Sequence, residues 1–181
     1  MDRDEVEMIG ETVRQSVEEI FPGAQVKIMG SYRRQKATCG DIDVHITHSS
    51  YVKKNPELGL SKIVDLLWER GHLVFHLTFL PGMTSGSNVA DYTKSSRHIP
   101  KTAWQLSKNA GYMSSKGHDG SSYMGVIRSP KVLGKRRRID IKFYPWRERI
   151  FASLYFTGNG YFNRSMRLWA SKKFRYGLIP R

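Results

Sequence analysis

Apolar residues recur every three or four positions near the start of the chain, in the stretch DEVEMIGETVRQSVEEIF. This spacing places them on one face of a helix, and the acidic residues at its beginning suit the positive end of the helix dipole. The Pro-Gly pair at 22–23 ends the helix. The apolar face consists of Val6, Ile9, Val13, Val17 and Ile20.

Two later stretches, DIDVHITH and RRRIDIKFYP, alternate strictly between apolar and polar residues, which indicates β-strands. In the first stretch, one face carries Ile42, Val44 and Ile46, and the other carries Asp41, Asp43 and His45. In the second, one face carries Ile139, Ile141 and Phe143, and the other carries Asp140, Lys142 and Tyr144. Both strands therefore combine an apolar face with a face that begins on an aspartate.

Weaker patterns predict three more strands and three more helices. The strands are expected within 24–30, 72–80 and 123–130, and the helices within 59–71, 146–156 and 161–174. Residues 81–122 are rich in Ser, Gly, Lys and Asn and lack a sustained period. We interpret them as a largely mobile surface insertion, with a short helix near KTAWQLSKNAG, because structureless runs of this length are unusual inside a compact domain.

Charge points to an anionic partner. The 181 residues carry a formal net charge of +14, and the residues after Glu148 include no acidic side chain. Nucleic acid or nucleotides are the first candidates, and a merely soluble basic protein is the alternative. The single cysteine, Cys39, excludes a disulfide within the chain and fits a reducing compartment. Without a membrane-length apolar run or a signal peptide, we expect an intracellular protein with no membrane association.

The two aspartates of the first strand suggest metal chemistry. Asp41 and Asp43 point the same way, and their charges repel and raise each other's pKa unless a cation lies between them. Mg²⁺ prefers oxygen ligands, and Asp140 could complete a site for two ions that assists displacement at phosphorus. The alternative is that Asp41 and Asp43 only line the solvent face of an edge strand.

The GSYRR segment before these aspartates suggests a phosphate grip. A Gly-Ser turn at the end of a strand can offer backbone N–H groups and the Ser31 hydroxyl to a phosphate. Arg33 and Arg34 can add charge-assisted hydrogen bonds. An enzyme of nucleoside triphosphates needs a phosphate grip next to a metal grip, although the two arginines could also form an ordinary solvated basic turn.

Three segments in order, GSYRRQKATCGDIDVHITH, RRRIDIKFYP and YFTGNGYFNRSMR, resemble the family X DNA polymerases of the beta and lambda type. The resemblance implies an α/β (α+β) fold of the polymerase-beta palm type, a small mixed sheet with packed helices, followed by the start of a helical thumb-type subdomain. The expected division is 1–146 for the nucleotidyltransferase palm, including the 81–122 insertion, and 147–181 for the beginning of the subdomain that contacts nucleotide and template.

The resemblance also assigns expected site residues. The metal-binding and catalytic residues are Asp41, Asp43 and Asp140. The residues that hold the β- and γ-phosphates are Ser31, Arg34 and the Gly40 backbone. The remaining nucleotide-binding residues are Tyr155 and Phe156 in the sugar pocket, Gly158 in a turn with a cis peptide, and Asn163 at the base edge. The DNA-binding residues are Arg138 near the primer terminus and Arg167 on the template strand.

The function that the resemblance implies is template-directed DNA synthesis of the repair type. Two Mg²⁺ ions, with Mn²⁺ as a substitute, would assist transfer of a deoxynucleotide from its triphosphate to a primer 3′-OH in gapped or primer–template DNA. We expect a nuclear monomer. Template-independent members tend to carry Gly-Trp in place of Tyr155-Phe156. The alternatives are another nucleotidyltransferase, acting on RNA or a small acceptor, and a catalytically inactive DNA-binding fragment.

Several features depart from the family pattern. Gln35 replaces a usual glycine, and His45 replaces a common leucine and is interpreted as a neutral, hydrogen-bonded imidazole. We also expect the chain to lack the amino-terminal lyase domain, the DNA-gripping subdomain and most of the thumb. Lyase activity is therefore not predicted.

Overall fold

The computed structural model describes residues 1–51, 59–78, 80 and 121–175. The expected 81–122 insertion thus lies outside the described residues except for its last two, and Ser122 already begins a strand. The expected helix near 101–111 also lies outside them. In chain order the elements are α1 (Arg3–Ile20), β1 (Gln25–Ile28), α2 (Gly30–Arg33), β2 (Ile42–His48), α3 (Leu60–Glu69), β3 (Leu73–His76), β4 (Ser122–Arg128), β5 (Arg136–Pro145), the 3-10 helix η2 (Trp146–Glu148), α6 (Arg149–Thr157) and α7 (Gly160–Phe174).

A five-stranded mixed sheet with the strand order β1-β2-β5-β4-β3 organises the fold. Strands β2 and β5 run parallel in its centre, and the other neighbouring pairs are antiparallel. A parallel pair needs a long crossover between its strands, and here the crossover includes α3, β3 and β4. The sheet and its packed helices confirm the predicted α/β class.

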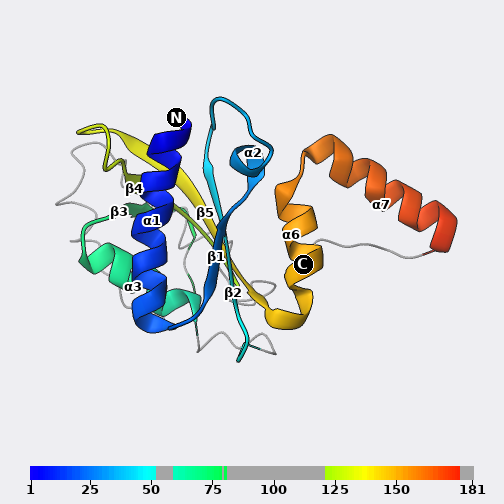
Figure 1. The fold of residues 1–181 in the computed structure, drawn as a ribbon, viewed down its shortest axis with the longest axis horizontal. Helices are drawn as coiled ribbons and strands as arrows, with labels where there is room; N and C mark the ends of the chain where they lie inside the picture. Colours follow the sequence, from blue (N-terminus) through cyan, green and yellow to red (C-terminus); the bar gives the residue numbers. More distant parts are fainter. Residues whose placement is uncertain (52–58, 79, 81–120, 176–181) are drawn as a thin grey trace, which may run out of the picture.

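Helices α1 and α3 cover one face of the sheet and form the core with it (Figure 1). The predicted stripe of α1 is fully buried from Val6 to Val17. It packs with the apolar faces of both alternating strands, which are Ile42, Val44 and Ile46 of β2 and Ile139, Ile141 and Phe143 of β5. Burial of this continuous apolar face against two helices supplies the hydrophobic stabilisation of the sheet.

The opposite face carries the polar residues, as the alternation predicts, but it is only partly exposed to solvent. Helix α6 packs over β2 and β5 there. His45 and Thr47 of β2 are 2% and 4% exposed, and Tyr144 of β5 is 6% exposed. Asp43, near the start of β2, and Asp140, in the middle of β5, remain partly exposed.

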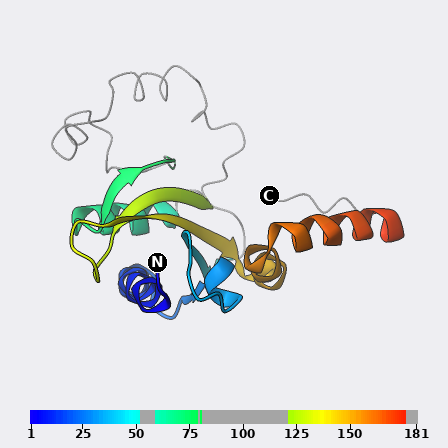
Figure 2. The ribbon, with the colours of Figure 1, turned by 90° about the horizontal axis from the view of Figure 1, so that it is seen from above.

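The chain turns sharply between α6 and α7. A cis peptide joins Gly158 to Asn159, as expected for this turn, and the Asn159 side chain caps α7 by accepting a hydrogen bond from the Phe162 amide at 3.0 Å. Helix α7 extends away from the sheet in both views (Figures 1 and 2). Within α7, only Asn163 and Ala170 are buried.

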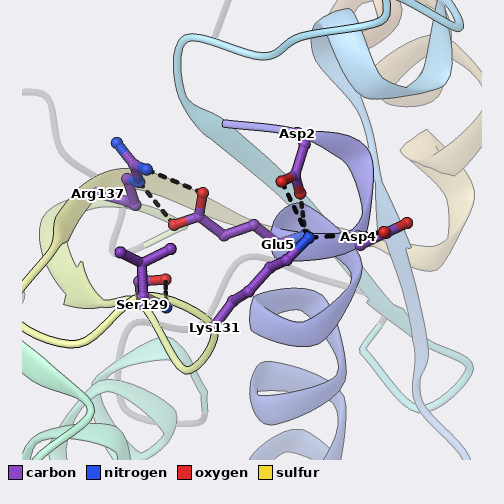
Figure 3. A network of polar contacts seen from close by, with 7 residues as sticks. Asp2, Asp4, Glu5, Ser129, Lys131 and Arg137 are labelled. Carbon is purple, nitrogen blue, oxygen red and sulfur yellow. Dashed lines mark hydrogen bonds and ion pairs between the residues drawn. The ribbon is translucent and has the colours of Figure 1, made fainter.

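A polar network ties the amino-terminal end of α1 to the β4–β5 hairpin (Figure 3). Glu5 is 2% exposed and accepts two hydrogen bonds from the Arg137 guanidinium, at 2.8 and 2.9 Å. Nearby, the Lys131 ammonium pairs with Asp2 at 2.9 Å and with Asp4 at 3.6 Å. The hydrogen bonds from Arg137 hold the pKa of Glu5 below its ordinary value. The network therefore positions the strand that carries Asp140.

We expect Glu5→Gln to lower the free energy of unfolding by about 1–3 kcal/mol at pH 7, because it leaves the Arg137 guanidinium without its carboxylate. The folded-state pKa is lowered, so the stabilisation exists above the unfolded pKa and is lost as the pH falls through the folded value. Urea unfolding at pH 7 and in acid measures the difference, which should shrink below pH ~4.

Glu11→Gln is the matched control, because Glu11 is half exposed and pairs with Arg14 on the surface of the same helix. Equal losses in both variants would show that the buried pair does not hold the hairpin.

Candidate active site

The parallel pairing of β2 and β5 brings the three predicted carboxylates together. Asp43 and Asp140 are directly opposite each other in the register of the two strands. Asp41 lies one residue before β2, on the same side as Asp43. The Arg138 guanidinium contacts both Asp41 and Asp140, with its Nε 3.5 Å from Asp140 Oδ1, which confirms that these carboxylates are close.

Burial and mutual repulsion perturb these carboxyl groups. The pKa of Asp43 is raised to about 7, first by burial and then by the charges of Asp41 and Asp140. The pKa of Asp140 is also raised, mainly by burial. Arg138 opposes both shifts but does not cancel them. Such a site gains free energy from any additional cation that the carboxylates can share.

The Arg138 guanidinium lies beside the carboxylates that would bind a cation. It forms ion pairs with Asp41 and Asp140, and its side chain is about half exposed. Among the residues that the structure describes, no group of three or more His, Cys, Asp or Glu side chains stands ready to hold a metal ion. The carboxylates thus converge without forming a finished coordination shell, and Arg138 would have to move for one to form.

Helix α2 begins directly against Asp43. The expected Gly-Ser turn is in fact this one-turn helix, and its first residue, Gly30, has a φ of 55°. A Cβ atom at Gly30 would lie 1.8 Å from Asp43 Oδ2. Only glycine permits both this backbone conformation and this close approach, so Gly30 determines where the carboxylate can lie.

A cleft of about 330 Å³ opens beside the carboxylates, between α2 and the α6–α7 turn. We call it the carboxylate cleft; it is lined by Gly30, Ser31, Arg34, Asp41, Asp43, Lys142, Tyr155, Phe156, Gly158, Asn159, Gly160 and Asn163. Three buried oxygens, Ser31 Oγ, Asp140 Oδ1 and Asn163 Oδ1, have no hydrogen-bond partner among the described residues. Buried polar atoms normally have partners, so these atoms fit a bound ligand with polar groups or a metal ion.

The α6 side of the cleft carries the aromatic pair. Tyr155 and Phe156 both line it, and the Lys142 ammonium lies 5.7 Å from the centre of the Phe156 ring. The Asn163 amide donates a hydrogen bond to the Tyr155 carbonyl at 2.8 Å, so one of its two N–H groups is already engaged. Arg34 donates a hydrogen bond to the Thr157 carbonyl and so connects α2 with the end of α6.

Four expected site residues, Gly40, Arg138, Asp140 and Arg167, are not among the residues that line the cleft. Gly40 is exposed, and Arg167 donates a hydrogen bond to the Asn163 carbonyl at 3.3 Å. The cleft is also lined by Lys142, Asn159 and Gly160, which the sequence patterns did not indicate as site residues. Gly30, another lining residue, begins the GSYRR segment that was expected to bind phosphate. The two-residue alternation from Asp140 was the signal that could have identified Lys142.

His45, which follows Asp43 on the same strand face, is not among the lining residues of this cleft. Its Nδ1 lies 3.1 Å from the Ser153 hydroxyl. Burial, together with the charges of Lys27 and Arg33, lowers the pKa of His45 to about 4. The imidazole is therefore neutral at physiological pH and hydrogen-bonded, as its sequence context predicts.

Comparison with known families identifies this architecture. The family model described as DNA polymerase beta palm matches residues 1–146, and the one described as DNA polymerase beta thumb matches residues 152–179. The chain belongs to the family X DNA polymerases. This membership agrees with the resemblance of the three sequence motifs.

Similar curated proteins of family X include polymerases and terminal transferases. DNA polymerase lambda of Rattus norvegicus is 32% identical over 96% of this chain and 24% of its own length, and that of Arabidopsis thaliana is 32% identical over 98% and 28%. DNA nucleotidylexotransferase of Ambystoma mexicanum is 30% identical over 92% and 32%. The chain spans about a quarter to a third of these relatives. In its described part, no helix has the length and apolar character needed to cross a membrane.

We expect Asp43→Asn to stabilise this family X chain at pH 8 when divalent ions are absent. The folded-state pKa of Asp43 lies above its ordinary value, so folding favours the protonated acid. The wild-type protein therefore loses this stabilisation as the pH rises from about 4 through 7, whereas the neutral amide does not. Thermal unfolding at pH 5 and pH 8 measures the difference between the two proteins at each pH.

Glu69→Gln, which removes an exposed carboxylate from the end of α3, is the control for the change in net charge. If Asp43→Asn shifted the melting temperature equally at both pH values, the buried carboxylate would not be the source of the effect.

Proposed function

We propose that the chain supplies the catalytic palm, over 1–146, and the start of the thumb, over 147–181, of a template-directed DNA polymerase that fills short gaps. One observation carries this proposal: Asp43 and Asp140 lie opposite each other in the register of β2 and β5, close to Asp41. Ser31 and Arg34 line the cleft next to them. The relatives named DNA polymerase lambda support it. Because the chain covers only part of their length, the activity is proposed for the whole protein.

The three carboxylates would hold Mg²⁺, for which Mn²⁺ would substitute. Their oxygen ligands suit a hard cation, and the raised pKa values of Asp43 and Asp140 fit its binding. When bound, two such ions supply charge neutralisation for attack by the 3′-OH and for departure of pyrophosphate. Asp41 and Asp43 would contribute to both ion positions, whereas Asp140 would contribute to the one beside the primer and help accept the 3′-OH proton.

The residues of α2 would bind the triphosphate. Ser31 Oγ has no hydrogen-bond partner among the described residues and can donate to a phosphate oxygen. Arg34 lines the same cleft and can donate charge-assisted hydrogen bonds. The Gly40 backbone would have to approach the phosphates from outside the lining that the structure shows.

The α6–α7 turn would hold the sugar and base. Tyr155 and Phe156 would line the sugar pocket and disfavour a ribose 2′-hydroxyl by steric contact. The Asn163 side chain would reach the base edge with its amide oxygen, which has no hydrogen-bond partner among the described residues, while one N–H stays on the Tyr155 carbonyl. Gly158 provides the backbone turn between the two helices.

Cationic groups around the cleft would bind DNA through its phosphates. Arg138 would approach the primer terminus after leaving Asp41, and Arg167 would contact the template strand. Phosphate contacts of this type position DNA without reading its sequence. A repair polymerase of this kind would act in the nucleus, and we propose a monomer.

We expect Asp140→Asn and Asp43→Asn each to reduce nucleotide incorporation at least about a hundredfold, because each variant removes a charge that the transition state requires. Primer extension on gapped DNA with Mg²⁺ measures the rate, using the longest natural polypeptide that contains these residues. Glu69→Gln is the matched control. Normal incorporation by either active-site variant would refute the assignment, and DNA binding without incorporation by the wild type would favour an inactive binding module.

The relatives named DNA nucleotidylexotransferase make template-independent addition the second candidate. Because Tyr155-Phe156 stands where such enzymes tend to carry Gly-Trp, we expect extension of gapped DNA to exceed extension of an unpaired single strand by at least about tenfold. Parallel assays with gapped DNA, single-stranded DNA and an RNA primer measure this preference. Equal extension of the single strand would favour template-independent addition, and preference for RNA would favour another nucleotidyltransferase.

A further inference from the structure

A second hollow, of about 460 Å³, lies between the β1–β2 edge of the sheet and helix α6. It is distinct from the carboxylate cleft, and the two share no lining residue. Adjacent residues of α2 separate them, because Arg33 lines this hollow whereas Arg34 lines the carboxylate cleft. The proposed polymerase chemistry leaves this second hollow unexplained.

Three cationic side chains, Lys27, Arg33 and Arg149, line the hollow, and no carboxylate does. None of the three forms an ion pair with a carboxylate within the described part of the chain. We call this site the cationic hollow. Three positive charges around one depression repel one another, and a bound anion would relieve that repulsion.

Arg149 is held in position by its neighbours. Its Nη1 donates a hydrogen bond to the Trp146 carbonyl at 2.8 Å, and its guanidinium lies 4.2 Å from the centre of the Trp146 ring. The remaining N–H groups stay available, because a guanidinium has five donors in a fixed fork. A side chain fixed in this way loses little conformational freedom when it binds a ligand.

Neutral hydrogen-bonding groups and two apolar residues of α6, Ile150 and Leu154, form the rest of the lining. Thr47 and His45 form buried polar parts of the wall. On the α6 side, the Ser153 hydroxyl lies 3.1 Å from His45 Nδ1, and the Thr157 hydroxyl donates to the Ser153 carbonyl at 2.6 Å. Gln25 adds an amide from the edge strand. The guanidinium groups of Arg33 and Arg149, together with the Lys27 ammonium, suit the several oxygens of a phosphate group. A phosphate group also carries more negative charge than a carboxylate.

We propose that the cationic hollow binds a phosphate group, either of a free diphosphate or of a nucleic-acid backbone. Its α6 wall belongs to the same helix that places Tyr155 and Phe156 in the carboxylate cleft. Thr157 contributes to this wall, while its carbonyl accepts the hydrogen bond from Arg34. Phosphate binding in the hollow would thus fix the end of α6 that borders the carboxylate cleft.

The test is an NMR titration of the 181-residue chain with pyrophosphate at 0.15 M salt, in the absence of divalent ions. We expect saturable shifts of the Lys27, Thr47 and Ser153 amide signals, separate from those of Ser31 in the carboxylate cleft. Site-specific signals keep the two locations distinguishable, so the result does not depend on the proposed polymerase function.

Lys27→Gln should weaken binding in the hollow at least about tenfold, because it removes one charge-assisted contact. Lys27 is exposed, and its side chain makes no hydrogen bond within the described residues, so this variant should fold normally. Arg149→Gln should weaken binding as well. Lys173→Gln, on the exposed surface of α7, is the control and should affect neither location.

The source of the phosphate is distinguished by competition. Displacement of pyrophosphate from the hollow by a short single-stranded oligonucleotide would assign the site to a nucleic-acid backbone, and retention would assign it to a free diphosphate. Absence of saturable shifts at these amides up to millimolar pyrophosphate would overturn the proposal. Unchanged affinity in Lys27→Gln and Arg149→Gln would overturn it as well.

Discussion

The parallel alignment of β2 with β5 is the constraint on which the site depends. It places Asp43 opposite Asp140, although almost a hundred residues separate them in the chain. A slip of one residue would turn one of these carboxylates toward the apolar core, because side chains alternate between the faces of a strand. The buried partners Ile42 and Ile139, directly before them in the same register, oppose such a slip through their packing against α1 and α3. The core thereby sets the geometry of the acidic cluster.

Holding three carboxylates close together lowers the stability of the folded protein, and contacts elsewhere in the structure offset this loss. The raised pKa of Asp43 shows that the folded protein holds this group in an environment that disfavours its ionised form. Buried contacts elsewhere compensate, including the Glu5–Arg137 pair that secures β5 to α1. Gly30 lets α2 lie directly against the Asp43 carboxylate, because any larger residue would place a Cβ atom on that carboxylate. Such local destabilisation within a rigid frame is typical of sites prepared for a ligand.

The sequence predicted the elements well, since α1 and the two alternating strands bury the residues that their spacing indicates. It could not predict that His45 and Thr47 would be buried too, because that depends on where α6 packs. The strand partner of β2 was likewise invisible to local spacing, and the family resemblance implied only that Asp41, Asp43 and Asp140 belong to one site. Gln35 illustrates a related limit: its φ of 59° explains why glycine is usual there, yet a single sequence shows only the substitution.

The arginines of the chain make different kinds of contact. Arg137 pairs with the buried Glu5, Arg138 pairs with Asp41 and Asp140, and Arg34 lines the carboxylate cleft. Arg33, the immediate neighbour of Arg34, lines the cationic hollow on the other side of α2. One turn of helix thus directs adjacent cations toward two separate depressions, and α6 forms a wall of both. A shift of α6 relative to the sheet must therefore change both depressions together, which couples them mechanically without any direct contact between their ligands.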